Sequence, residues 1–226
     1  MRYHEVIEGR FLQRPNRFVA HVETADGIQI CHVKNTGRCR ELLVPDAAVY
    51  LERAGNPARK TAYDLIAVKK GNLLINMDAQ APNPVFQEWA ARGNFLPDVQ
   101  SIRSEYRYGE SRLDFAVYTR AGLHLVEVKG VTLEDDGVVR FPDAPTERGV
   151  KHIRELEKAV REGTAATLFF VIQMHGVRCF SPNDETHPAF GTALREAAAA
   201  GVQICAYDCV VTPDQITMGR PVPVKL

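Results

Sequence analysis

Residues 111–130, SRLDFAVYTRAGLHLVEVKG, form the segment around which we expect the rest of the chain to be built. Leu113, Phe115 and Val117 alternate with other residues, and Leu123 and Leu125 do so again after a turn at residues 120–122. Alternation with a period of two is typical of a strand that has one face in a core. The segment therefore predicts two antiparallel strands joined by a short turn.

Three charged residues, Asp114, Glu127 and Lys129, interrupt this otherwise apolar hairpin. Side chains alternate faces along a strand, so Glu127 and Lys129 point the same way, about 6.5–7 Å apart. Charged groups in a core strand are costly unless they pair with one another or hold a metal ion. The residues alone leave two interpretations open: a metal site, or a structural ion pair between Glu127 and Lys129.

The composition is that of a folded chain with a real core. It has 226 residues, 45% of them hydrophobic, which is enough for one large or two small domains. There is no run of eighteen apolar residues and no signal-like apolar run near the first residues, so we expect no membrane segment. The five cysteines include no Cys-x-x-Cys pair, and we read them as reduced thiols of a cytoplasmic protein.

The net charge is zero, but the charge is unevenly distributed. Residues 1–80 carry 12 Lys and Arg against 9 Asp and Glu, whereas residues 81–226 carry 16 against 19. A mildly basic part beside a part that contains paired carboxylates is suited to handling a polyanion, although the asymmetry is small. Neutrality overall argues against a strongly basic nucleic-acid-binding protein.

The first eighty residues are predicted to be all-β. The strand-like runs are short and separated by turn signals such as Asp26-Gly27. These runs are 9–13, 18–24, 28–33, 48–53, 63–69 and 73–75. Five or six short strands in this length favour a small barrel of the oligonucleotide-binding (OB) type.

Two loops of this barrel carry guanidinium and amide groups, one before the second strand and one after the third. Such groups suit phosphate or sugar oxygens, which makes the loops candidate nucleic-acid contacts. The alternative is that they are ordinary solvated side chains around turns. The candidate residues are Arg14, Asn16, Arg17, Asn35, Arg38 and Arg40.

Residues 78–84, DAQAPNP, predict a boundary between a first domain of residues 1–80 and a second of residues 81–226. After it we expect a helix with Asn83 as its cap, Pro84 in its first position and Gly93 at its end. Glu88 falls at the edge of the buried face of this helix.

The second domain is predicted to be α/β, with a mixed sheet flanked by helices. Its expected strands are 101–108, 112–118 and 123–129, then a covered strand at 165–174 and a last one at 202–207. Helices are expected at 146–161 and 188–200. The apolar run AATLFFVIQM at 165–174 is typical of a strand covered on both faces.

An Asp, twelve residues, and then Glu-x-Lys on the next strand is the arrangement of the PD-(D/E)xK nucleases. Two carboxylates on adjacent strands can share a hard cation, Mg²⁺ or Mn²⁺, and leave coordination sites for water and a phosphate oxygen. Lys129 would orient that water or stabilise the transition state, and Glu88 would add another metal ligand. No organic cofactor is expected.

The chain also resembles the sugar fermentation stimulation protein A family along essentially its whole length. The matching stretches include RFLQRPNRF (10–18), NTGRCRELL (35–43), SRLDF (111–115), EVKGVTL (127–133) and FPDAPTERGVKHIR (141–154). The resemblance implies an N-terminal OB-type barrel and a C-terminal nuclease-like domain. It also implies DNA binding of low sequence specificity and a regulatory part in the use of sugars such as maltose.

On the family pattern Asp114, Glu127 and Lys129 occupy the nuclease-motif positions, with Glu88 as the acid on the helix. Arg148, Lys151 and His152 would face the site from the first turns of the following helix, where backbone N–H groups favour a phosphate. The plain alternative for these three is the ordinary polarity of a helix start, with His152 as a packing residue.

Three functional hypotheses remain open at this stage. The first is a metal-dependent phosphodiesterase acting on nucleic acid, and the second is a non-catalytic DNA-binding regulator that keeps the nuclease fold. Direct sugar binding by the barrel is weaker, because the single tryptophan, Trp89, has core spacing. Neither the oligomeric state nor the form of the nucleic acid follows from the sequence.

Overall fold

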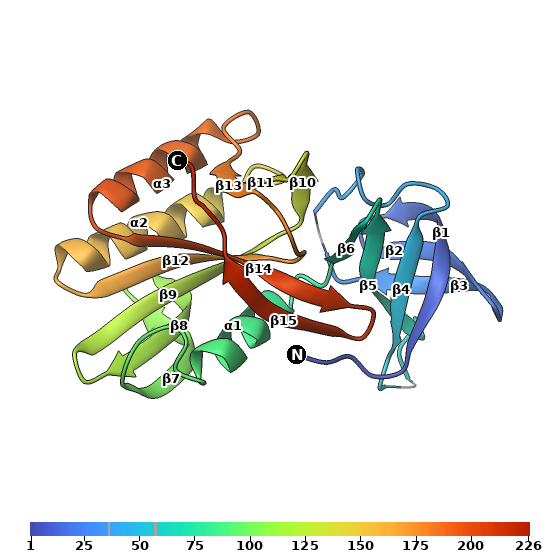
Figure 1. Cartoon of the computed structure of the whole chain (residues 1–226), viewed down its shortest axis with the longest axis horizontal. Coiled ribbons are helices and arrows are strands. Elements are labelled where there is room, and N and C mark those ends of the chain that lie inside the picture. The colour runs from blue at the N-terminus through green and yellow to red at the C-terminus, as the bar shows by residue number, and fades with distance from the viewer. Residues whose placement is uncertain (36, 57) are drawn as a thin grey trace.

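The chain folds into a small barrel and a larger α/β part that lie side by side, as the computed structural model in Figure 1 shows. The structure describes residues 1–35, 37–56 and 58–226. Thr36, which belongs to the second predicted binding loop, lies outside the described residues.

The barrel is built from the strands that the sequence predicts. They are β1 (Val6–Asn16), β2 (Val19–Thr24), β3 (Gly27–Val33), β4 (Ala48–Arg53), β5 (Tyr63–Lys70) and β6 (Leu73–Asn76). The sheet order is β3-β2-β1-β4-β5-β6, and a parallel pairing of β3 with β5 closes the first five strands into a barrel. The predicted OB-type barrel is therefore confirmed.

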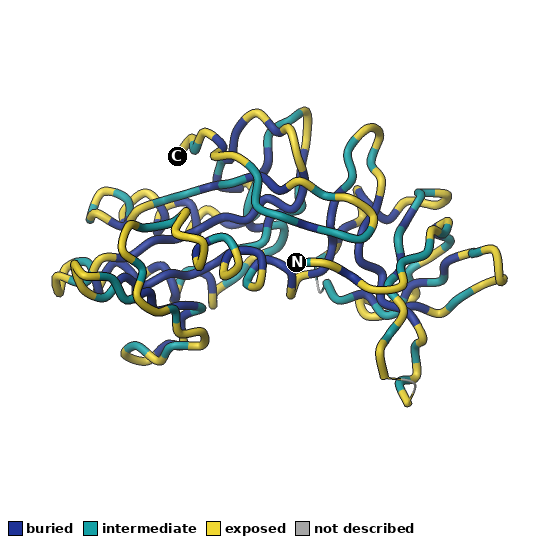
Figure 2. Tube along the Cα trace, turned by 60° about the horizontal axis from the view of Figure 1, so that its bottom comes forward, coloured by how far each residue is buried: buried dark blue, intermediate teal, exposed yellow. Residues whose placement is uncertain are grey.

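The larger part contains a six-stranded sheet in the order β15-β14-β12-β9-β8-β7. Its strands are β7 (Val99–Tyr108), β8 (Ser111–Thr119), β9 (Gly122–Val131), β12 (Ala165–Ile172), β14 (Gln203–Thr212) and β15 (Gln215–Pro221). The central strands β9, β12 and β14 are parallel, and the outer pairings are antiparallel. The predicted mixed sheet is confirmed. Its middle strands β9 and β12 are mostly buried, and Figure 2 shows the buried parts of the chain in dark blue.

The structure adds elements that the sequence does not predict. The last predicted strand continues into a hairpin with β15, and a separate small sheet pairs β10 (Leu133–Asp135), β11 (Val138–Phe141) and β13 (Cys179–Pro182). Three of these strands have only three or four residues, too few to establish a period of two. β15 ends on Gly-Arg-Pro, and glycine and proline are depleted in strands.

Helices cover both faces of the large sheet. α1 (Pro82–Ala90) contacts β9 and β15, whereas α2 (Glu147–Arg161) contacts β8 and β12 and packs against α3 (Pro188–Ala199). α1 begins one residue before the predicted cap, with Ala81 rather than Asn83 at the N-cap position. No helix in the described part of the chain is both long and apolar enough to cross a membrane.

Candidate active site

The hairpin of β8 and β9 opens at one end, and the candidate pocket lies in that opening. The regular ladder between the strands ends at the pair Phe115–Val126. Beyond it, the carboxylate of Asp114 accepts a hydrogen bond from the backbone N–H of Val128 at 2.8 Å. Because the side chain takes the place of a backbone carbonyl, the strands separate and leave a pocket of about 360 Å³.

The structure brings Asp114, Glu127 and Lys129 together in this pocket. Asp114 also accepts a hydrogen bond from the Asn83 amide at 2.8 Å. Burial raises the pKa of Asp114 above its usual value, and the nearby Glu127 carboxylate raises it further. Asp114 is thus held in place by two donors while its charged form remains electrostatically unfavourable.

Glu127 is 2% exposed and its two carboxylate oxygens have different surroundings. Oε1 contacts the Lys129 ammonium and Nδ1 of His152. Oε2 is buried and has no hydrogen-bond partner among the described residues. Burial would raise the pKa of Glu127, but the hydrogen bond from His152 and the charge of Lys129 outweigh it, so this pKa is lowered.

Hydrogen bonds at both ring nitrogens fix the orientation of His152. Arg148 and His152 both line the pocket, four residues apart on α2 and therefore on the same face of that helix. The Arg148 Nε donates to Nε2 of His152 at 3.4 Å, which leaves Nδ1 to donate to Glu127. Arg148 thus contributes positive charge and orients the ring that supports Glu127.

Two of the predicted residues lie elsewhere. Lys151 is exposed, and its ammonium donates to the carbonyl of Glu110 at 3.2 Å instead of lining the pocket. Glu88 is half-exposed and pairs with the N-terminal amine of Met1 at 2.6 Å, in a different pocket beside Trp89. The expectation that Glu88 joins Asp114 and Glu127 is therefore wrong.

Helical geometry explains the error at Glu88. Asn83 faces the pocket, and a residue five positions further along a helix lies about 140° around its axis. Glu88 is consequently turned away, and Asn83 is the α1 side chain that reaches Asp114. The sequence predicts Asn83 as the helix cap; the signal that it could reach the pocket is its position at the start of the helix that follows the predicted boundary.

The pocket suits a hard divalent cation in its donor set. The buried Glu127 and the half-buried Asp114 line it, and one Glu127 oxygen is unpartnered among the described residues. Such a group is expensive to bury and is stabilised by a cation. In the described parts of the chain no three His, Cys, Asp or Glu side chains gather closely enough to hold an ion. Asp114 and Glu127 would therefore hold the cation with other oxygen ligands, such as water.

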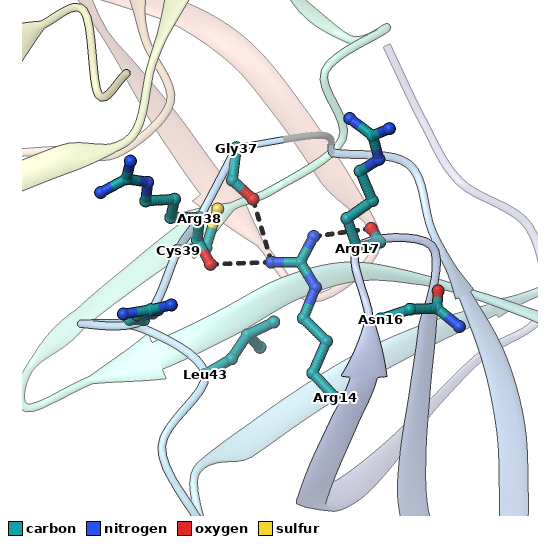
Figure 3. A pocket seen from close by; sticks show the side chains of 8 residues that line it. Arg14, Asn16, Arg17, Gly37, Arg38, Cys39 and Leu43 are labelled. Atoms are coloured by element: carbon teal, nitrogen blue, oxygen red, sulfur yellow. Dashed lines mark hydrogen bonds between the residues drawn. The ribbon is translucent and has the colours of Figure 1, made fainter. Parts of the chain in front are cut away.

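The barrel loops form a second pocket, of about 400 Å³, in which Arg14 is central (Figure 3). Arg14 donates four hydrogen bonds to backbone carbonyls at distances from 2.7 to 3.0 Å. These carbonyls belong to Arg17, Asn35, Gly37 and Arg38. Arg14 therefore holds the two loops together, and its guanidinium is occupied by protein rather than free for a phosphate.

Some of the other predicted loop residues face the pocket, and others are held by hydrogen bonds within the protein. Arg17, Arg38 and Arg40 line the pocket, and Figure 3 shows the side chains of Arg17 and Arg38 extending away from the Arg14 guanidinium. Asn16 also lines it, although its side-chain oxygen accepts a hydrogen bond from the N–H of Phe18 at 2.9 Å. Asn35 donates to the carbonyl of Met77 at 3.1 Å and lines a separate pocket at the junction of the two parts.

Comparison with known proteins accounts for nearly the whole chain. Residues 12–77 match the SfsA N-terminal OB domain, and residues 80–215 match the sugar fermentation stimulation protein RE domain. A sugar fermentation stimulation protein homolog of Desulfitobacterium hafniense is 55% identical over 228 residues, covering 100% of this chain and 99% of that one. The chain belongs to the sugar fermentation stimulation protein family.

Other members of the family are similar over their full length. The homolog of Clostridium beijerinckii is 51% identical and both chains are fully covered. A solved structure of Pyrococcus furiosus SfsA in complex with Ca²⁺ superposes with a TM-score of 0.91 at 29% identity, covering 100% of this chain and 98% of that one. The family resemblance read from the sequence motifs is thus confirmed.

Proposed function

We propose that this sugar fermentation stimulation protein homolog is a divalent-metal-dependent phosphodiesterase that binds nucleic acid through its barrel. The observation that carries the proposal is the buried, unpartnered Oε2 of Glu127, which shares a pocket with the Asp114 carboxylate. A buried carboxylate oxygen without a donor is costly, and a cation held by Glu127 and Asp114 would remove that cost.

The cation is proposed to be Mg²⁺ or Mn²⁺ in the working protein. The relative from Pyrococcus furiosus was solved with Ca²⁺, which also prefers oxygen ligands, and this supports a hard cation in the family. When bound, such an ion lowers the pKa of a water ligand and offsets charge on the phosphate. Asp114 and Glu127 would hold the ion.

Lys129 and Arg148 are proposed to act on the substrate. The Lys129 ammonium lies beside Glu127 in the same pocket and can orient an attacking water or stabilise charge on the phosphate oxygens. Arg148 lines the pocket with a guanidinium suited to a phosphate oxygen. His152 positions Glu127 through the hydrogen bond to Oε1.

The partner is proposed to be DNA, bound with low sequence specificity. The pocket between the barrel loops, which we call the barrel pocket, is lined by Arg17, Arg38 and Arg40. These arginines would contact phosphates, which carry no base information. The described cysteines are free thiols, in keeping with a proposed cytoplasmic location.

Titration calorimetry and cleavage assays test the proposal. We expect Mn²⁺ to bind the wild-type protein and to bind Glu127→Gln at least tenfold more weakly, because one charged ligand is lost. We expect Lys129→Ala to retain Mn²⁺ binding but to cleave DNA about 100-fold more slowly. Lys158→Ala, which alters an exposed lysine on α2, is the matched control. Cleavage that persists in Lys129→Ala would remove Lys129 from the reaction.

The second candidate is a non-catalytic DNA-binding regulator of sugar use. It is favoured by the pairing of Glu127 Oε1 with Lys129 and His152, which partly neutralises the carboxylate without a metal. In that case Lys129 and Arg148 would grip a phosphate in the pocket. This candidate predicts salt-sensitive DNA binding, no divalent-metal binding by calorimetry and no hydrolysis with any metal.

A further inference from the structure

A third pocket joins the barrel to the candidate active site. It holds about 100 Å³ and lies where the loop after β3, the strand β11 and the end of β12 meet. In Figure 1 the small sheet that contains β11 lies between α2 and the barrel. The lining residues are Asn35, Ala79, Gly130, Thr132, Arg140, Phe141, Asp143 and Gln173. We call it the junction pocket.

The junction pocket adjoins the active-site pocket, and the two share lining residues. Ala79 and Gly130 line both pockets. A Cβ atom at position 130 would lie 2.5 Å from the Gln173 side-chain oxygen and 2.7 Å from Pro82, so only glycine fits without displacing its neighbours. The backbone at Gly130 therefore packs closely against Gln173 and Pro82 where the two pockets meet.

On its other side the junction pocket adjoins the barrel pocket. Asn35 lines the former and Gly37 the latter, and the Asn35 side-chain oxygen accepts a hydrogen bond from the N–H of Gly37 at 2.8 Å. Arg14 donates to the carbonyls of both residues and fixes their positions. The three pockets thus follow one another from the arginines of the barrel to Asp114 and Glu127.

Arg140 is the cation of the junction pocket. It lies on β11, and its guanidinium makes no hydrogen bond or ion pair with any residue in the described ranges. By contrast, Arg10, Arg59 and Arg154 each form an ion pair with a carboxylate. A half-buried, unpaired guanidinium that faces a polar pocket is suited to an anion.

We propose that a single strand of nucleic acid runs from the barrel pocket through the junction pocket to the active site, with one backbone phosphate held by Arg140. The inference rests on the proposed function and specifies its substrate. A pocket of about 100 Å³ is too small for a base pair, which favours a single strand over a duplex. The half-buried ring of Phe141 lines the same pocket and offers a face for base stacking.

Asp143 determines on which side of the junction pocket the phosphate lies. Its carboxylate lines the pocket next to Gly37, because a Cβ atom at position 37 would lie 2.2 Å from Asp143 Oδ2. A carboxylate repels a phosphate but accepts a hydrogen bond from a base amino group or a sugar hydroxyl. The phosphate therefore lies on the Arg140 side, and the base or sugar edge faces Asp143.

Fluorescence anisotropy without divalent metal tests the path. Labelled oligothymidylates of about four and about sixteen nucleotides, the matching oligouridylate and a duplex are titrated against the protein. We expect the long strand to bind more tightly than the short strand and the duplex. Arg140→Ala should weaken the long strand about tenfold and reduce the salt slope by about 0.7, while short-strand affinity stays unchanged.

The matched control is Arg120→Ala, because Arg120 is an exposed arginine in the turn at the opposite end of the β8–β9 hairpin. It should bind every probe as the wild type does. If the wild type binds no nucleic acid, the proposed function falls together with the path. If the long strand binds but Arg140→Ala behaves like Arg120→Ala, or if the duplex binds as tightly as the strand, the path alone is overturned.

Discussion

At the scale of single residues, Glu127 and His124, both on β9, lie in contrasting surroundings. The Lys129 ammonium and the His152 ring contact Glu127 and lower its pKa, whereas His124 has no charged partner and is 6% exposed. Its Nε2 is 2.8 Å from the Thr167 hydroxyl, and its ring packs edge-on against Phe95. Burial lowers the pKa of His124 to about 4.

His124 should make the protein sensitive to mild acid. Between pH 6.5 and 4 the unfolded chain takes up a proton at this residue while the folded chain does not, so stability falls as the pH falls. The shift corresponds to about 3 kcal/mol across that window. Urea unfolding at pH 7 and pH 4 measures it, with His124→Gln as the comparison because glutamine keeps a hydrogen-bonding group for Thr167.

We expect the wild type to lose about 3 kcal/mol more than His124→Gln between these two pH values. The other titrating groups are common to both proteins, so they cancel in the comparison. Parallel losses in the two proteins would mean that His124 is protonated in the folded state and that this account is incorrect.

At the scale of elements, the first turn of α2 positions Arg148 and His152 in the pocket. Thr146 precedes the helix, and its hydroxyl accepts a hydrogen bond from the N–H of Gly149 at 3.0 Å. This bond satisfies one of the free donors at the start of the helix. Arg148 and His152 lie within the first two turns, so the cap also fixes where they reach the pocket.

Replacing Thr146 by alanine should destabilise the protein by about 1 kcal/mol, because the N–H of Gly149 loses its partner. Chemical denaturation measures the change. Thr146→Ser, which keeps the hydroxyl, is the control and should remain within a few tenths of a kcal/mol of the wild type. Equal losses in both variants would assign the effect to the methyl group instead of the cap.

At the scale of the whole molecule, a buried polar network joins the barrel to the large sheet. The Gln173 amide, at the end of β12, donates to the backbone carbonyls of Asn76 and Asp78 and to the Asn76 side chain at 2.9–3.1 Å. Asn76 in turn donates to the Tyr3 hydroxyl at 2.9 Å. Because every member has a partner, the network fixes the angle between the two parts.

Gln173→Met should loosen this connection. The substitution keeps the approximate volume but leaves the carbonyls of Asn76 and Asp78 without their donor, at a cost of about 2–3 kcal/mol. We expect calorimetry to show one unfolding transition for the wild type and separate transitions of the two parts for Gln173→Met. Gln100→Met, at an exposed glutamine, is the control. A single, unshifted transition in Gln173→Met would show that the network does not couple them.

The sequence by itself determined the strand pattern of the barrel, the hairpin that carries Asp114 and Glu127, and the helices that follow. Alternating and helical periodicities are local properties, so they are readable over as few as five or six residues. The family followed from motifs of similar length. The division of the chain at residues 80 and 81 and the roles of the site residues stay predictions.

Only the tertiary structure decided which side chains meet. It turned Glu88 away from the pocket and brought Asn83 into it, because the two residues lie about 140° apart around the helix axis and only one of them can face the pocket. It committed Arg14 to backbone carbonyls, and it placed Arg140 from a strand of four residues between two pockets. Periodicity fixes the face of an element, whereas the neighbours of that face depend on contacts distant in sequence.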